Sequence, residues 1–304
     1  MEVLTSLNEL RNVGYDLAVT IGNFDGVHRG HQQLIKDIMA LCEKNNECLV
    51  VCTFVPHPKF ILTNNQNFLI NSYIERRDLL AKLGVKFLVE FEFNRDFSTQ
   101  TPQDFLDNYI SIANVSSLYL GHDFAFGANK SGDHDFVKKY CNNKNINCVL
   151  EKEFTSGDAS KVSSTSVRDF LLDGDINNAN NLLGRNFYVT GRVIKGVGRG
   201  KTIGFPTANI IFPNERLIPK TGVYKSSTMI NGMRYNSITN IGHNPTFNDS
   251  SLINFETHIF DFDNDIYGEE ITIELIDFIR PEKKFNNVNE LISQINLDIE
   301  DVKK

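Results

Sequence analysis

The chain has 304 residues, of which 41% are apolar and 23% charged, as in globular proteins of one large or two ordinary domains. Its formal net charge of −7 argues against a general nucleic-acid binder, and no apolar run is long enough to span a bilayer, so we expect neither nucleic acid nor membrane as a partner. Five cysteines without a close CxxC pair, and an N-terminus without the apolar region of a signal peptide, favour a reducing cytoplasm.

The first half of the chain alternates strand-like and helix-like segments. Strands are expected at Leu17–Ile21, Cys48–Phe54, Lys86–Phe91, Ser117–Leu120 and Cys148–Leu150, and helices at about Gly30–Lys44, Ser72–Leu83, Pro102–Ala113 and Asp133–Cys141. This alternation predicts an α/β domain with a doubly wound, Rossmann-like parallel sheet. Ligands of such sheets bind beyond the carboxyl ends of the strands.

A glycine-rich turn follows the first of these strands. Gly22, Gly26 and Gly30 lie at close spacing around His28, and His31 follows at the start of the next helical pattern. A strand, a glycine turn and a helix start together form a context that binds phosphate. The two histidines lie on one helical face, so both can donate to the same anion. Metal ligation is the competing interpretation, but we find no carboxylate or thiol partner at a useful spacing.

Two more turns follow other predicted strands and should lie at the same edge of the sheet. They are Pro56–Pro58 and Gly121–Asp123. The glycine-rich loop after the second turn carries Phe124 and Phe126. Either this is a surface loop anchored by two phenylalanines, or it stacks on or covers a planar ring.

A run of three hydroxyl residues, Ser163–Thr165, precedes another apolar helical pattern. On its own this run predicts a helix N-cap. A functional interpretation adds that the hydroxyls, the free amides and Arg168 could bind phosphates. The short helix Ile176–Leu183 follows, and we place the end of the first domain there.

The second domain, residues 184–304, has a different sequence pattern from the first, residues 1–183. Strands rich in β-branched and aromatic residues are expected at Phe187–Val193, Val223–Ile230, Arg234–Ile241, Ile253–Phe260 and Glu270–Ile279, with a long helix at Val288–Val302. Asn231-Gly232 is a strong hairpin signal. The pattern predicts an antiparallel β-barrel with a terminal helix.

A second glycine-rich stretch opens this domain. Gly196 and Gly198 expose backbone amides, and Lys201 adds positive charge, a composition that suits a flap over phosphates. The stretch is not a P-loop, because the order and spacing of that motif are absent. Thr207 and Asn209, just after it, are hard oxygen donors suited to Mg²⁺.

Glu256 and His258 alternate with other residues on a predicted strand and therefore share one face. On pattern alone, such a pair more often serves solubility on a half-exposed strand. Beside a phosphate flap, however, the carboxylate becomes a candidate general base for a hydroxyl nucleophile.

Together these motifs resemble those of the bacterial bifunctional riboflavin kinase/FMN adenylyltransferase family, also called FAD synthetase, over nearly the whole chain. In the first domain the matching segments are Thr20–His31 (TIGNFDGVHRGH), Phe54–Pro58, Gly121–Gly132 and Val162–Arg168. In the second domain they are Gly191–Asn209, Gly222–Tyr224, Asn240–Phe247, Glu256–Asp263 and Arg280–Phe285, again in the family's order.

This resemblance implies two reactions that use ATP and Mg²⁺. The C-terminal domain would phosphorylate riboflavin to FMN, and the N-terminal domain would transfer AMP from a second ATP to FMN, giving FAD and pyrophosphate. The implied catalytic residues are His28, His31, Arg168 and Glu256, the last as the base of the kinase. The implied ATP contacts are Gly22, Phe24, Ser163, Ser164, Thr165, Gly196, Gly198, Lys201 and Asn209; the Mg²⁺ ligands are Thr207 and Asn209; and the flavin contacts are Asp123, Phe124, Phe126 and Arg280.

Lys130 departs from the family pattern, because many relatives have arginine in this loop. Lysine keeps the charge but loses the planar fork of donors. A second hypothesis is therefore a chain in which only the kinase is active. A third is a flavin-binding or flavin-sensing protein without catalysis, against which Glu256 and Thr207–Asn209 argue, since binding alone needs neither a base nor a metal pair.

Overall fold

The computed structural model describes residues 1–63, 65, 67–121, 126–128, 131–150, 162–196, 198–211, 215–243 and 253–303, with the backbone alone of Arg199 and His243. Two compact units account for the chain: a sheet unit of Met1–Gln66 with Asn71–Ser163, and a barrel unit of Asn67–Ile70 with Ser164–Lys304. The domain boundary that we place after Leu183 concerns the two activities, and it remains a prediction.

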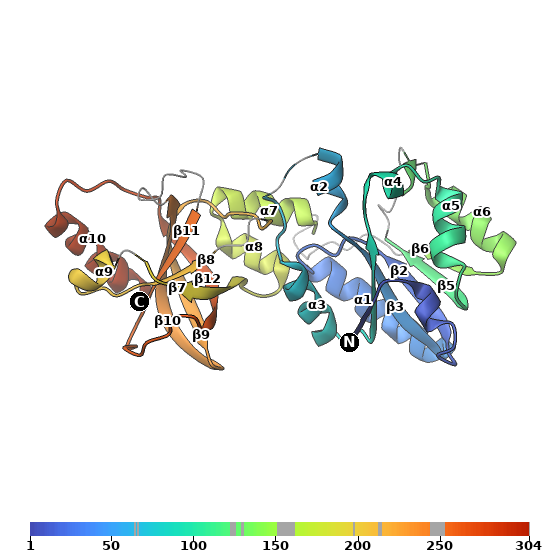
Figure 1. Cartoon of the computed structure of the whole chain (residues 1–304), viewed down its shortest axis with the longest axis horizontal. Helices are drawn as coiled ribbons and strands as arrows, with labels where there is room; N and C mark the ends of the chain where they lie inside the picture. Colours follow the sequence, from blue (N-terminus) through green and yellow to red (C-terminus); the bar gives the residue numbers. More distant parts are fainter. Residues whose placement is uncertain are drawn as a thin grey trace. The chain divides into compact units, whose positions relative to one another are not determined.

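The sheet unit is built on six parallel strands in the order β1-β4-β3-β2-β5-β6 (Figure 1). They are β1 Glu2–Leu4, β2 Asp16–Ile21, β3 Glu47–Val55, β4 Phe87–Glu92, β5 Val115–Leu120 and β6 Asn147–Leu150. Five of them are the predicted strands, and only the three-residue β1 was not predicted. Continuous apolar runs such as Leu17–Val19 are buried because helices cover both faces of the sheet.

The helices of the sheet unit divide between those two faces (Figure 1). They are η1 Leu7–Leu10, α1 Arg29–Asn45, α2 Pro58–Thr63, α3 Tyr73–Lys82, α4 Arg95–Ser98, α5 Pro102–Phe105, η2 Leu106–Ile110 and α6 His134–Lys144. One core packs α1 and α3 on the sheet, and the other packs η1, α5, η2 and α6 on the opposite face. The predicted doubly wound fold is thereby confirmed.

One predicted helix, Pro102–Ala113, is shorter than expected. The α-helical part α5 ends at Phe105, and the π-helical turn η2 follows and ends at Ile110. The amide of Ser111 donates to the carbonyl of Leu106 at 2.8 Å, so hydrogen bonds over five residues replace the α-helical pattern.

The strand order reverses at β2. The connection from β2 leads to β3 and β4 on one side, whereas β5 and β6 lie on the other side. The carboxyl ends of β2 and β5 therefore form the topological switch point, where open α/β sheets bind their ligands. The turn that follows Ile21 starts at this point.

The barrel unit is a closed antiparallel barrel in the order β10-β11-β8-β7-β12-β9. Its strands are β7 Phe187–Ile194, β8 Ala208–Ile211, β9 Gly222–Ile230, β10 Met233–His243, β11 Ile253–Ile259 and β12 Glu270–Arg280. Five were predicted, as was the tight hairpin at Asn231-Gly232, whose φ angles are +49° and +80°. The short β8 was not predicted, because three of its four residues are buried in succession and show no alternation.

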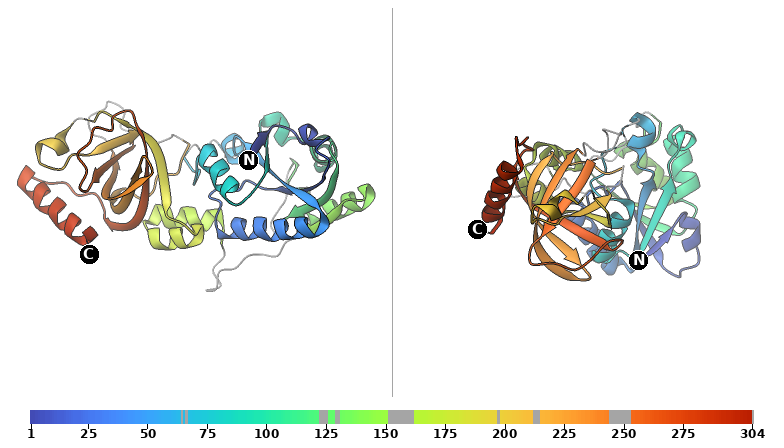
Figure 2. Two further views of the ribbon diagram at one scale, coloured as in Figure 1. Left: turned by 90° about the horizontal axis from the view of Figure 1, so that it is seen from below. Right: turned by 60° about the vertical axis from the view of Figure 1, so that its left-hand side comes forward.

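The described residues of the barrel unit form the helices α7 Ser164–Asp173, α8 Ile176–Leu183, α9 Arg199–Thr202 and α10 Val288–Lys303. The terminal helix α10 lies outside the barrel (Figure 2). Its Val302 packs with Val223 and Ile238 of the barrel wall. The predicted barrel with a terminal helix is confirmed.

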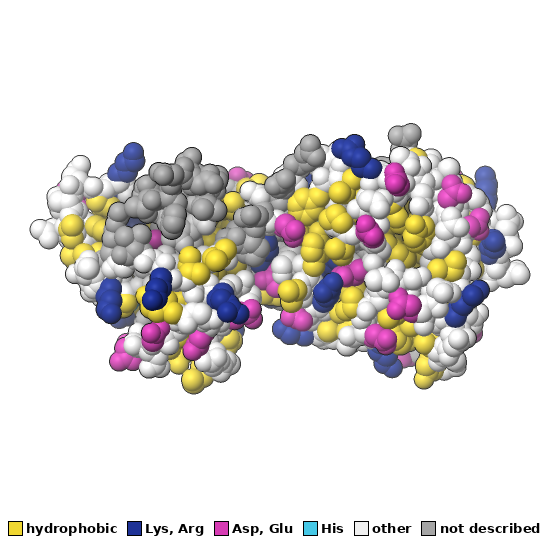
Figure 3. Space-filling model, viewed as in Figure 1, with side chains coloured by type: hydrophobic (Ala, Val, Ile, Leu, Met, Phe, Trp, Pro, Cys, Tyr) yellow, Lys and Arg dark blue, Asp and Glu magenta, His cyan; other side chains and the backbone are white. Residues whose placement is uncertain are grey.

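Charged side chains of both signs are interspersed on the face shown in Figure 3. Apolar side chains lie between them over both units. Among the described residues of this face, no continuous basic surface is seen.

Candidate active sites

The turn after β2 brings the two predicted histidines together. His28 is the N-cap of α1 and is 5% exposed, and its Nδ1 accepts a hydrogen bond from the amide of His31 at 3.3 Å. The two rings stack with their centroids 3.7 Å apart and 15° between their planes. Because Nδ1 is the acceptor, the proton of neutral His28 lies on Nε2, which is then a donor at the helix N-terminus.

Two glycines leave room for the aromatic rings that pack at this turn. A Cβ at Gly30 would lie 3.2 Å from Nδ1 of His28, and one at Gly22 would lie 3.1 Å from Cε2 of Phe24. The ring of Phe24 meets that of His31 edge-on at 5.2 Å. Gly22 and Phe24 therefore shape the histidine pair, and their contact with ATP stays a prediction.

The predicted flavin contacts of this unit are described only in part. Asp123, Phe124 and Lys130 lie outside the described residues. Phe126 exchanges backbone hydrogen bonds with Gly132 at 3.2 and 2.9 Å, and its ring packs against Phe105 at 5.1 Å. This supports the anchoring interpretation of Phe126, and its flavin contact stays a prediction.

The predicted phosphate residues near α7 divide between the two units. Ser163 ends the sheet unit, whereas Ser164 and Thr165 begin α7 in the barrel unit. In the same unit, Nε of Arg168 donates to the carbonyl of Phe68 at 2.9 Å, and the guanidinium lies 5.1 Å from the Phe68 ring. Arg168 thus ties α7 to the segment Asn67–Ile70, and the phosphate contacts of these residues stay predictions.

The barrel unit assembles a polar cluster on β8 and β11. Glu256 lies directly opposite Asn209 in the antiparallel register. Nδ2 of Asn254 donates to Oδ1 of Asn209 and to Oε1 of Glu256, both at 2.8 Å. We did not predict Asn254, although its position two residues before Glu256 puts it on the same face of the strand.

The glycine flap packs on this cluster. A Cβ at Gly196 would overlap the side-chain amide of Asn209, and one at Gly200 would lie 3.4 Å from Oγ1 of Thr207. Gly198 has a φ of +76° and caps α9, while Lys201 is exposed. The structure therefore brings the predicted flap, Thr207, Asn209 and Glu256 into one place.

Arg280, a predicted flavin contact, forms an ion pair with Asp298 of α10. Its Nε donates to Oδ1 and Oδ2 of Asp298 at 2.9 and 3.0 Å, and its Nη2 donates to Oδ2 at 2.7 Å. Asp298 is 3% exposed, so this pair anchors the terminal helix. A direct contact of Arg280 with flavin stays a prediction.

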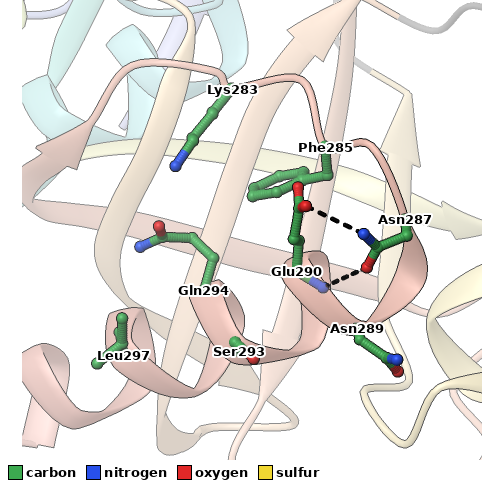
Figure 4. Close-up of a pocket in the computed structure, with 8 residues that line it drawn as sticks. All are labelled: Lys283, Phe285, Asn287, Asn289, Glu290, Ser293, Gln294 and Leu297. Carbon is green, nitrogen blue, oxygen red and sulfur yellow. Dashed lines mark hydrogen bonds between the residues drawn. The ribbon is translucent and has the colours of Figure 1, made fainter.

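A cavity of about 380 Å³ lies between α10 and the loop before it (Figure 4). Its lining residues are Lys283, Phe285, Asn287, Asn289, Glu290, Ser293, Gln294 and Leu297. The amide of Gln294 donates to Oδ1 of Asp298 at 2.9 Å, which links the cavity wall to the Arg280 pair. No local sequence pattern indicates this cavity, because a loop and a helix form it together.

Family models match both halves of the chain: FAD synthetase over residues 11–166 and riboflavin kinase over residues 183–304. The bifunctional riboflavin kinase/FMN adenylyltransferase of Listeria monocytogenes is 37% identical over 94% of this chain and 91% of its own length. This chain belongs to the bifunctional riboflavin kinase/FMN adenylyltransferase family. The relative from Escherichia coli K12 is 34% identical over 98% of this chain and 96% of its own. The predicted family and enzyme class are confirmed.

A solved structure extends the likeness to the whole fold. The crystal structure of the macrolide-efflux protein from Streptococcus pneumoniae is 32% identical, with a TM-score of 0.88 over 100% of this chain and 98% of that one. Among the described residues of this chain, no helix is both long and apolar enough to cross a membrane.

Proposed function

We propose that this chain makes FAD in two steps, the first in residues 184–304 and the second in residues 1–183. The barrel unit transfers the γ-phosphate of ATP to the 5′-hydroxyl of riboflavin and forms FMN. The sheet unit then transfers AMP from a second ATP to FMN, which forms FAD and releases pyrophosphate. The observation that carries this proposal is that each unit matches its own family model and holds its own polar site.

In the kinase reaction, Glu256 is the general base. Its carboxylate takes the proton of the riboflavin hydroxyl as the phosphoryl group arrives. Asn254 donates to Oε1 of this carboxylate at 2.8 Å, which holds the group in place. In the flap, Gly196, Gly198 and Gly200 supply backbone amides for the phosphates of ATP.

The same cluster fits Mg²⁺. In the described chain no group of three or more His, Cys, Asp or Glu side chains could hold a metal ion. Oγ1 of Thr207 and Oδ1 of Asn209 are instead hard oxygen donors of the kind that share Mg²⁺ with nucleotide phosphates. When bound, the ion neutralises phosphate charge during transfer. Thr207 and Asn209 would hold it next to Glu256.

In the adenylyl transfer, the sheet unit stabilises negative charge. Nε2 of His28 and the ring of His31 donate to the phosphates of ATP at the N-terminus of α1. Pyrophosphate gains charge as it leaves, so these donors act most strongly in the transition state. No covalent enzyme intermediate is needed.

The riboflavin ring has a candidate place in the barrel unit, the cavity of Figure 4. Phe285 offers an aromatic face, and Asn287, Asn289 and Gln294 offer amide groups for the polar edge of a flavin. All five cysteines of the chain are free thiols, as suits the reducing cytoplasm in which we place both reactions.

The experiment that tests this proposal is product analysis of the purified chain with riboflavin, ATP and Mg²⁺. We expect FMN to form first and FAD to accumulate. FMN alone would contradict the adenylyltransferase assignment, and unchanged riboflavin would contradict both. Supplying FMN in place of riboflavin tests the second step by itself, and omitting Mg²⁺ should stop both steps.

A further inference from the structure

A buried ion pair lies beside the histidine turn of the sheet unit. Arg76 of α3 is 2% exposed, and its Nη2 donates to Oε1 of Glu90 on β4 at 3.1 Å. Burial lowers the pKa of Arg76, while the charge of Glu90 opposes that shift. Arg77, whose side chain is 38% exposed, binds the same carboxylate. Glu90 therefore has two partners, of which only Arg76 is buried.

The second terminal nitrogen of the Arg76 guanidinium contacts the histidine turn. Its Nη1 donates to the carbonyl of Asn23 at 3.1 Å, and Oγ1 of Thr53 donates to the same carbonyl at 3.3 Å. Phe24 and Val27, further along the turn, have φ angles of +48° and +39°. Such angles are unfavourable for side chains of this kind, so surrounding contacts must hold the turn in place.

The start of α3 also contacts the neighbouring turn after β3. The hydroxyl of Tyr73 accepts a hydrogen bond from the amide of His57 at 2.8 Å, and the guanidinium of Arg76 lies 5.0 Å from the Tyr73 ring. Ser72 and Glu75 form a capping box that fixes this first turn of the helix. The helix start is thus rigid and linked to two turns at the carboxyl edge of the sheet.

We propose that Arg76 is a positioning residue for adenylyl transfer. Its two nitrogens join Glu90 to the carbonyl of Asn23 and so hold the turn that presents His28 and His31. The planar guanidinium fork donates to both groups from two separate nitrogens, a geometry that the single nitrogen of a lysine does not reproduce. This inference rests on the proposed function of the histidine turn.

The test compares Arg76→Lys with Arg77→Lys. Both substitutions weaken a contact to Glu90, but only the first removes the hydrogen bond to Asn23. We expect Arg76→Lys to lower kcat for FMN adenylylation by about 10- to 100-fold, as for a small misplacement of catalytic groups, and to change the KM for ATP much less. Arg77→Lys should stay within about twofold, because Arg77 approaches Glu90 from the solvent side, where an ion pair contributes little. Amide hydrogen exchange of residues 22–28 should quicken in Arg76→Lys alone.

Two results would overturn the inference. One is a wild-type kcat and unchanged exchange in Arg76→Lys, and the other is an equal loss in both variants, which would show a structural role only. His28→Ala tests the proposed function of the histidine turn independently of Arg76. If this variant retains full adenylylation, the proposed function itself fails. Should Arg76→Lys not fold, the double variant Arg76→Gln/Glu90→Gln is compared with Glu90→Gln alone. The inference then predicts a kcat for FMN adenylylation about 10- to 100-fold lower in the double variant than in Glu90→Gln, and equal values would overturn it.

Discussion

The two sites of this chain are positioned in different ways. In the barrel unit, β-sheet register alone places Glu256 opposite Asn209, with Asn254 two residues away on the same strand. In the sheet unit, His28 follows a turn with two unfavourable φ angles, and contacts from α3 hold that turn. A site built on register is placed by backbone pairing, whereas a site built on a strained turn depends on the contacts that hold the turn.

The largest expected effect on either site is at the kinase base, Glu256. Glu256→Gln keeps the shape of the side chain but removes the proton acceptor, so kcat for FMN formation should fall by about 10²- to 10⁴-fold. Conversion of added FMN to FAD should be unchanged. Chromatography of the flavins measures both steps.

Glu274→Gln is the matched control for that substitution. Glu274 belongs to the same barrel, but its carboxylate accepts hydrogen bonds from Arg234 and Asn186. Burial raises its pKa, and the bonds from these partners outweigh that effect and lower it. Kinase activity should persist in this variant. An equal loss of kcat in Glu274→Gln and Glu256→Gln would contradict the assignment of the base.

Smaller effects are expected from substitutions at two glycines, each of which should lower a different one of the two activities. Gly196→Ala puts a methyl group into the side-chain amide of Asn209, and Gly30→Ala puts one 3.2 Å from Nδ1 of His28. We expect kinase activity to fall about tenfold in the first and adenylylation about threefold in the second, as side chains are forced off their rotamers. Each variant should spare the other activity, and loss of both in either variant would contradict the separation of the sites.

The difference between the sites also explains how far the sequence could be interpreted. The position of Glu256 on a β-strand follows from alternation, and so does the face that it shares with His258. Even here β8 was missed, because its buried run has no alternation. The strand before the histidine turn and the helix after it were predicted equally well.

What could not be predicted are the contacts between distant segments. Arg76 and Glu90 lie in an ordinary helix and an ordinary strand, and only the fold brings them to Asn23. The bond between Arg280 and Asp298 has the same origin, since no local pattern pairs a residue of β12 with one of α10. Predicted phosphate residues near α7 likewise engage partners, such as Phe68, that no local pattern indicates.

The central claim, that residues 184–304 carry the kinase and residues 1–183 the adenylyltransferase, is tested most directly by mixing two inactive variants. Glu256→Gln should convert FMN but not riboflavin, and His28→Ala should stop at FMN. Because FMN made by one variant can diffuse to the other, an equimolar mixture supplied with riboflavin, ATP and Mg²⁺ should form FAD, whereas neither variant does so alone. If the mixture forms no FAD while each variant remains folded, or if either substitution abolishes both steps, the division of the two activities between the units is wrong.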